Sequence, residues 1–126
     1  MQFSTKAEYG LRAVIVLAKT YPKLKSITEI SREEKISAKY LEQIFGVLRR
    51  NKIVNSYKGK NGGYTLAKNP SKLSVVDIVE ALEGSLAPMK CQRPKCINAK
   101  CPSKKVWVKL GKEIKKTLKN IKIDSL

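Results

Sequence analysis

The stretch SAKYLEQIFGVLRR, residues 37–50, decides the fold predicted for this chain. Its apolar residues recur at intervals of three and four, which places them on one face of a helix and predicts that this face is buried. Ser37 stands just before the helix, where its hydroxyl can accept a hydrogen bond from a free backbone N–H group. The other side is polar and can hydrogen-bond base edges or phosphates. This polar side carries Lys39, Gln43 and Arg50, with Tyr40 and Glu42 beside them.

Two short runs typical of β-strands follow this helix, IVNSY at residues 53–57 and GYTLA at residues 63–67. The segment between them contains Asn61-Gly62, which predicts the positive φ of a tight hairpin turn. Lys58 and Lys60 make the hairpin basic. A helix followed by a basic hairpin is typical of a DNA-recognition helix and its wing.

Three further helices are predicted around this unit. Apolar spacing indicates a first helix over residues 5–20, a short second helix from about 27 to 34, and another from Ser74 to Gly84 that closes the core. The spacings Thr5-x-x-Glu8 and Ser26-x-x-Glu29 predict capping boxes at the first two helix starts. A short helix, a tight turn at residues 35–37 and a longer helix with a polar face together predict a helix-turn-helix.

The last segment, residues 102–122, predicts one long amphipathic helix. Its apolar stripe consists of Trp107, Leu110, Ile114, Leu118 and Ile121. A helix of about 20 residues spans about 30 Å, which exceeds the small core it would have to cover. A partner subunit is the simpler surface, with first and last helices meeting across a two-fold axis and two recognition helices about one DNA turn apart.

The predicted fold class is therefore mainly α with a small β wing. A winged helix-turn-helix domain occupies residues 1–84, a cysteine loop residues 85–101, and a dimerisation helix with its tail residues 102–126.

Composition narrows the function classes. The 126 residues include 27 Lys and Arg against 10 Asp and Glu, a net charge of +17, which favours nucleic acid because bound phosphates release counterions. An anionic membrane surface is the weaker alternative, since no basic amphipathic helix stands apart from a core, and no apolar run is long enough to span a membrane.

The start of the chain does not resemble a signal peptide, so we expect a cytoplasmic protein. Because the chain has no histidine, few carboxylates and no nucleophile or phosphate-loop motif, we expect no enzyme activity.

Three cysteines, Cys91, Cys96 and Cys101, follow a C-x4-C-x4-C pattern. A step of five residues turns a helical side chain by about 140°, so these thiols converge only in a loop. Such a loop can hold an iron–sulfur cluster or a structural zinc. Zinc fits less well, because its ligands usually come as close pairs and the chain lacks histidine. Three free thiols, or a thiol oxidation sensor, remain alternatives.

With these elements in place, the sequence resembles the IscR, NsrR and CymR family of bacterial winged-helix transcriptional regulators over nearly its whole length. The resemblance is carried by the opening FSTKAEYGLRA (3–13), by ISAKYLEQI (36–44), by the wing GKNGGY (59–64) and by the three cysteines. It implies a homodimer that binds a palindromic double-stranded DNA operator and, in cysteine-bearing members, senses cluster status, nitric oxide or redox state. It also implies that Glu42 contributes to operator choice and that Lys58 enters the minor groove.

The resemblance leaves the fourth cluster ligand open. Lys104 stands where IscR-like members have a ligating histidine, and the cysteine spacing is one residue shorter at each step than in those members. NsrR-like members instead use an aspartate from the first helix of the other subunit, and Glu8 matches that position. We therefore expect either that Glu8 is a ligand across the dimer or that it serves in the capping box with Thr5.

The predicted function is a homodimeric DNA-binding transcriptional regulator, with repressor as the expected role and activator left open, that senses a 2Fe-2S or 4Fe-4S cluster, redox state or nitric oxide. The predicted metal ligands are Cys91, Cys96, Cys101 and Glu8, and the predicted DNA contacts are Lys39, Tyr40, Glu42, Gln43, Arg50, Lys58 and Lys60. One alternative is a cluster-free repressor controlled by thiol oxidation or a partner protein. Another is a basic RNA- or ribosome-associated protein whose cysteine loop is a zinc knuckle.

Overall fold

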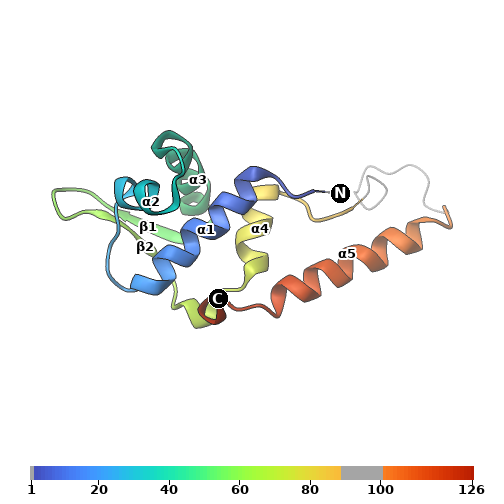
Figure 1. Ribbon diagram of the computed structural model, residues 1–126. Coiled ribbons are helices and arrows are strands. Elements are labelled where there is room, and N and C mark those ends of the chain that lie inside the picture. The colour runs from blue at the N-terminus through green and yellow to red at the C-terminus, as the bar shows by residue number, and fades with distance from the viewer. Residues whose placement is uncertain (1, 89–100) are drawn as a thin grey trace.

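The computed structural model describes residues 2–88 and 101–126 (Figure 1). Helices dominate, and one antiparallel hairpin is present, so the predicted fold class is confirmed. The elements are α1 (Thr5–Thr20), α2 (Ile27–Glu34), α3 (Ala38–Arg50), β1 (Val54–Tyr57), β2 (Gly63–Leu66), the 3-10 turn η1 (Pro70–Lys72), α4 (Val75–Glu83), α5 (Lys104–Lys119) and the 3-10 turn η3 (Ile123–Ser125).

Two of the predicted helix starts are confirmed. The predicted capping box at α2 is present, since Ser26 Oγ accepts from the Glu29 backbone at 3.1 Å and the Glu29 carboxylate accepts from the Ser26 backbone at 3.3 Å. At α3, Ser37 Oγ accepts from the backbone N–H of Tyr40 at 3.3 Å.

The capping box predicted at Thr5 is wrong. Thr5 is already the first helical residue of α1, so the N-cap is Ser4, whose Oγ accepts from the backbone of Ala7 at 3.1 Å. The Glu8 backbone N–H donates to the Ser4 carbonyl at 3.1 Å as part of the helix. The Glu8 side chain is therefore not used as a capping partner of Thr5.

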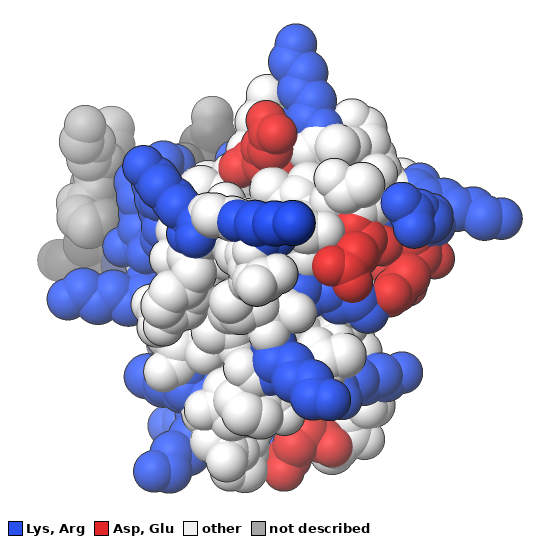
Figure 2. Space-filling view, turned by 90° about the vertical axis from the view of Figure 1, so that its left-hand side faces the viewer, with Lys and Arg blue, Asp and Glu red and all other residues white. Residues whose placement is uncertain are grey.

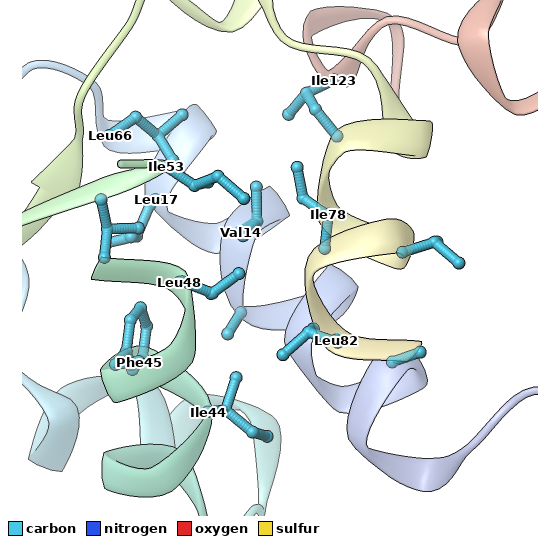
Figure 3. Close-up of a cluster of buried hydrophobic side chains, with 14 of the residues drawn as sticks. Val14, Leu17, Ile44, Phe45, Leu48, Ile53, Leu66, Ile78, Leu82 and Ile123 are labelled. Carbon is cyan, nitrogen blue, oxygen red and sulfur yellow. The ribbon is translucent and has the colours of Figure 1, made fainter. Parts of the chain in front are cut away.

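The core forms where α1, α3 and α4 meet (Figure 3). The predicted apolar face of α3, residues Leu41, Ile44, Phe45 and Leu48, is completely buried. Gly10 of α1 lies against α4, because an ideal Cβ at this position would overlap Leu82 Cδ1. This close approach fixes the first turns of α1 against the end of α4.

The hairpin pairs Val54 with Leu66 at its base and Tyr57 with Gly63 at its far end. The expected Asn61-Gly62 turn is wrong: neither residue has a positive φ, and Gly59, at φ 108°, turns the chain instead. Gly62 is needed for a different reason, since a Cβ there would overlap the Tyr57 carbonyl oxygen. The loop between the strands is the predicted five-residue segment 58–62, and only the position of its positive φ differs from the prediction.

Helix α5 begins at Lys104, two residues later than predicted, and none of its residues is buried in the chain. Its end is attached to the body: Leu118 and Ile121 pack against the core, and Ile123 is 1% exposed. Backbone hydrogen bonds reinforce this attachment, from Val75 to the Ile121 carbonyl at 2.9 Å and from Ile123 to the Leu73 carbonyl at 2.8 Å. Figure 1 shows α5 extending on the side of the molecule opposite the hairpin.

Candidate nucleic-acid interface and cysteine site

The exposed side of α3 is the first part of the candidate DNA interface. Lys39, Glu42, Gln43 and Arg50 are all exposed, while the opposite side of the same helix is buried. The hydroxyl cap at Ser37 and the apolar face therefore hold α3 so that one amide, one carboxylate and two cations face outward. These groups can read base edges and bind phosphates.

The wing is the second part of this interface. Lys58 and Lys60 are exposed at the far end of the hairpin, next to Tyr57, which is 53% exposed. Phe45 of α3 stacks on Tyr64 of β2 with ring centroids 4.6 Å apart, and this contact sets the hairpin against the recognition helix. Arg49 Nη1 donates to Ser56 Oγ at 3.2 Å and joins the same two elements.

Sequence reasoning did not select Tyr57 or Arg49. Their positions give a signal only once the strand and helix registers are known, because Tyr57 is the last strand residue before the wing loop and Arg49 faces the hairpin. Both are further candidates for DNA contact.

On the face from which the wing projects, positive charge is spread out rather than gathered in one patch (Figure 2). Figure 2, viewed from the side on which the wing projects, shows Lys and Arg side chains around the outline and a few separate groups of Asp and Glu. Among the described residues three ion pairs form, Arg12–Glu34, Lys25–Glu33 and Lys115–Glu80. Most of the 27 basic side chains thus have no carboxylate partner in that part of the chain.

Tyr40 lies at the start of α3 and contacts α1. The Tyr40 ring meets the Tyr9 ring edge-to-face, with centroids 5.8 Å apart. The Arg12 guanidinium lies over the Tyr9 ring, 5.3 Å from its centroid. Arg12 also donates to the carboxylate and the backbone carbonyl of Glu34 at the end of α2. Tyr40 is half-buried by these contacts, so only part of it is available to DNA.

The cysteine site is described at one of its three predicted residues. Cys91 and Cys96 lie outside the described residues, and residues 2–88 and 101–126 contain no group of three His, Cys, Asp or Glu that could hold a metal ion. Cys101 is partly exposed, and its Sγ lies 2.9 Å from Ser103 Oγ.

Hydrogen bonds from the Ser103 side chain, then from the Ser103 backbone, lower the pKa of the Cys101 thiol, with a smaller contribution from the Lys104 backbone. Cys101 also borders a cavity of about 680 Å³ that is lined by Lys104, Lys105, Lys109 and Lys112 of α5. A thiolate is the form that ligates metal and reacts with oxidants. Cys101 therefore has the chemistry that a cluster ligand needs.

Glu8 lies on the first turns of α1 and is exposed. It forms no ion pair with the rest of the described chain. The same end of α1 lies beside the segment that leads to the cysteine loop, since Phe3 lines one cavity together with Glu83 and residues 85–88. The Glu8 carboxylate is thus available to a group outside its own helix.

These features match one known family. The family model of Rrf2, iron-dependent transcriptional regulators, matches residues 3–126. The chain belongs to the Rrf2 family. It is 31% identical over 128 residues to the HTH-type transcriptional regulator CymR of Bacillus subtilis, covering 100% of this chain and 89% of the relative. It is 33% identical over 129 residues to the regulator IscR of Pectobacterium atrosepticum, covering 100% of this chain and 79% of the relative.

Solved structures agree with this membership. The structure of CymR, the global cysteine regulator of B. subtilis, has a TM-score of 0.83 at 30% identity and covers 98% of this chain and 94% of its own. T. potens IscR has a TM-score of 0.81 at 33% identity, covering 99% and 85%. This Rrf2 protein is therefore a DNA-binding transcriptional regulator, a class without enzymatic activity. No helix in the part of the chain that the structure describes is long and apolar enough to cross a membrane.

Proposed function

We propose that this Rrf2 protein is a homodimeric repressor that binds a palindromic operator through α3 and the wing, and that its cysteines hold an iron–sulfur cluster. The observation that carries the DNA-binding part is the exposed polar side of α3, held beside the basic wing by the Phe45–Tyr64 stack. Glu42, the exposed carboxylate among cations, discriminates between operators, because a carboxylate can accept from a base edge but repels phosphates.

Dimerisation is supported by the apolar surface of α5. Val106 is 58% and Leu110 39% exposed, and Phe3 is 48% exposed near the same end of the molecule. A 16-residue helix with no fully buried side chain, which packs on the core of its own chain through Leu118 near one end, has less of the packing that stabilises most helices. A second copy of the chain supplies that packing and places two recognition helices on one operator.

The cluster is proposed to be held by Cys91, Cys96 and Cys101, with Glu8 of the other subunit as the fourth ligand. The family description as iron-dependent, the lowered pKa of the Cys101 thiol and the availability of the Glu8 carboxylate support this set. When bound, a 2Fe-2S or 4Fe-4S cluster supplies a group whose presence or charge responds to iron, oxidants or nitric oxide.

The residues of α1 connect the ligand position to the DNA-binding surface. Glu8 and Tyr9 are adjacent on α1, and the Tyr9 ring contacts Tyr40 at the start of α3. A change in the position of the first α1 turns therefore reaches the recognition helix through one aromatic contact. A shift of one or two kcal/mol between two dimer states changes their ratio about 5- to 30-fold, which is enough for a regulator.

The test of the cluster is the iron and acid-labile sulfide content, with the visible spectrum, of protein purified without oxygen. We expect a coloured protein with iron and sulfide in near-equal amounts, two or four per chain. Glu8→Ala should reduce cluster content, and Glu8→Asp should keep it. A colourless protein that resists anaerobic reconstitution would rule out the cluster.

The test of DNA reading compares two variants on a panel of operator sequences. Glu42→Ala should change the order in which operators are preferred, whereas Lys58→Gln should weaken binding and reduce its salt dependence. Equal loss of affinity for all duplexes in Glu42→Ala would remove its proposed reading role.

One observation favours a second candidate, a cluster-free repressor that responds to thiol oxidation. Cys101 is partly exposed and its thiolate is stabilised by Ser103, as a thiol sensor requires. The Bacillus subtilis relative is named CymR, and one solved structure is described as an oxidized form of Staphylococcus aureus CymR. The same anaerobic measurement separates the two, since this candidate predicts colourless protein whose operator binding changes with peroxide.

A further inference from the structure

A row of five exposed lysines runs along α5. Its members are Lys105, Lys109, Lys112, Lys116 and Lys119, and we call them the lysine row. Because each helical residue turns the chain by about 100°, the five side chains fall within an arc of about 80° around the helix axis. The direction midway between Val106 and Leu110, which are apolar and exposed, lies about 120° from the middle of this arc. A partner that covers the apolar residues therefore leaves the lysine row facing outward.

Among the described residues the lysine row has little opposing charge, although Lys105, Lys109 and Lys112 also line the cavity beside Cys101. The one acidic residue of α5 is Glu113, at the edge of the row, and the ion pair of this helix with α4 uses Lys115, which lies outside the row. Successive members of the row are three or four residues apart, and like charges at these spacings destabilise a helix. Keeping α5 soluble would need only a mixture of charges, so a row of one sign indicates an anionic partner.

The position of α5 excludes one simple partner, the duplex held by the recognition helix. In Figure 1, α5 extends away from the body on one side, whereas α3 and the wing lie on the other. A straight duplex along α3 does not run past the lysine row. The anion is therefore a different molecule, or a distant part of the same DNA.

The chemistry of the row fits a phosphate backbone. Lys105 to Lys119 span about 21 Å, and a duplex presents one negative charge per about 1.7 Å of its axis, so every lysine can find a phosphate. An anionic membrane fits less well, because a helix lying on a membrane inserts its apolar side. In α5 part of that side packs on its own domain through Leu118, and Val106 and Leu110 are assigned to the dimer.

We propose that the lysine row binds the phosphate backbone of a second DNA segment, so that one regulator bridges two duplexes. This inference rests on the proposed function, since the winged helix supplies the first duplex. Lysines on a helix surface contact phosphates without reading bases, so the second segment needs no operator sequence. The same contact supports looping between distant sites on one DNA molecule.

The test is a bridging assay with the full chain. One biotinylated duplex is fixed on beads, protein is bound to it, and capture of a second, fluorescent duplex is measured. The variant with all five row lysines changed to glutamine should lose capture, while its affinity for a single duplex changes less than about 3-fold. The matched variant with all five changed to arginine should keep capture, and both replacements have helix propensities close to that of lysine. With five phosphates neutralised, doubling the monovalent salt should weaken the capture step about 20-fold.

Failure of this inference is distinguishable from failure of the proposed function. The variant Lys39→Gln/Lys58→Gln/Lys60→Gln should lose single-duplex affinity, and no change there would contradict the proposed function whatever the row does. Capture that persists in the five-glutamine variant would show that two winged helices bridge the duplexes and would overturn the inference. Absence of capture by the unmodified protein would do the same, as would lysine-dependent binding to phosphatidylserine vesicles without capture of DNA.

Discussion

Gly10 of α1 packs against Leu82 of α4. We expect the effect of Gly10→Ala on the free energy of unfolding to change sign when residue 82 is changed from leucine to alanine. An ideal Cβ at Gly10 overlaps Leu82 Cδ1 and lies 3.3 Å from Ile44 Cγ2. In a helix interior, alanine is favoured over glycine by about 1 kcal/mol. Overpacking a core costs about 1–3 kcal/mol, so Gly10→Ala alone should lower the free energy of unfolding by about 0–2 kcal/mol.

The Leu82→Ala background removes the overlapping atom. Leu82 is 8% exposed, so this change alone should cost about 2–5 kcal/mol. Gly10→Ala added to it should then stabilise the protein by up to about 1 kcal/mol, giving a coupling of about 1–3 kcal/mol between the two positions.

Urea unfolding followed by circular dichroism measures all four proteins, at one fixed concentration because the stability of a dimer depends on it. A matched control is Gly46→Ala, since a Cβ at Gly46 would meet only the end of the Arg50 side chain, at 3.6 Å. That change should stabilise in both backgrounds. If Gly10→Ala has the same effect with leucine and with alanine at position 82, the close packing of α1 on α4 is wrong.

Three further predictions concern Ser103 before α5, Leu110 within it and Ile123 after it. Ser103→Ala should raise the pKa of the Cys101 thiol, because the Ser103 side-chain hydrogen bond is the largest cause of its lowering. The measurement is the pH dependence of the alkylation rate, in metal-free protein with the other two cysteines changed to serine. The midpoint of that curve should move to higher pH. Leu110→Glu should shift the protein from dimer to monomer in analytical ultracentrifugation, whereas Lys109→Gln, on another side of the helix, should not. Ile123→Ala should lower the free energy of unfolding by about 2–5 kcal/mol in urea titration, since its side chain is 1% exposed, and a change under about 0.5 kcal/mol would contradict the docking of the tail.

The winged helix-turn-helix could be predicted because its signals are local. The spacing of Leu41, Ile44 and Phe45 requires a buried helix face, and the Ser26–Glu29 capping box marks the start of α2 without reference to the rest of the fold. These features depend on residues three or four apart, which a linear sequence displays directly.

Features that depend on tertiary contacts were not predicted. Ile123 looks like part of a short polar tail, and its burial follows only from backbone pairing with Leu73. The loop over residues 58–62 agrees with the predicted strand runs, but the positive φ was assigned to Asn61-Gly62, the strongest local hairpin signal, and it falls on Gly59. The predicted N-cap at Thr5 is one residue too late, since Ser4 can cap equally well and the helix begins at Thr5.

The two ends of α5 differ in how firmly they are held, and this difference bears on regulation. At its C-terminal end, Leu118 and Ile121 pack on the core, Ile123 is buried, and Lys115 pairs with Glu80. In its N-terminal half, nearer Cys101, Val106 is 58% exposed and Leu110 is 39% exposed. Segments with few buried contacts move at little cost in free energy. In the dimer proposed above, a change at the cysteines would reposition the start of α5 against α1 of the second copy while the core stays folded, and the Tyr9–Tyr40 contact would carry a displacement of α1 to the recognition helix. Regulation by this route would need no unfolding of the DNA-binding domain, because the part that moves is the exposed N-terminal end of α5.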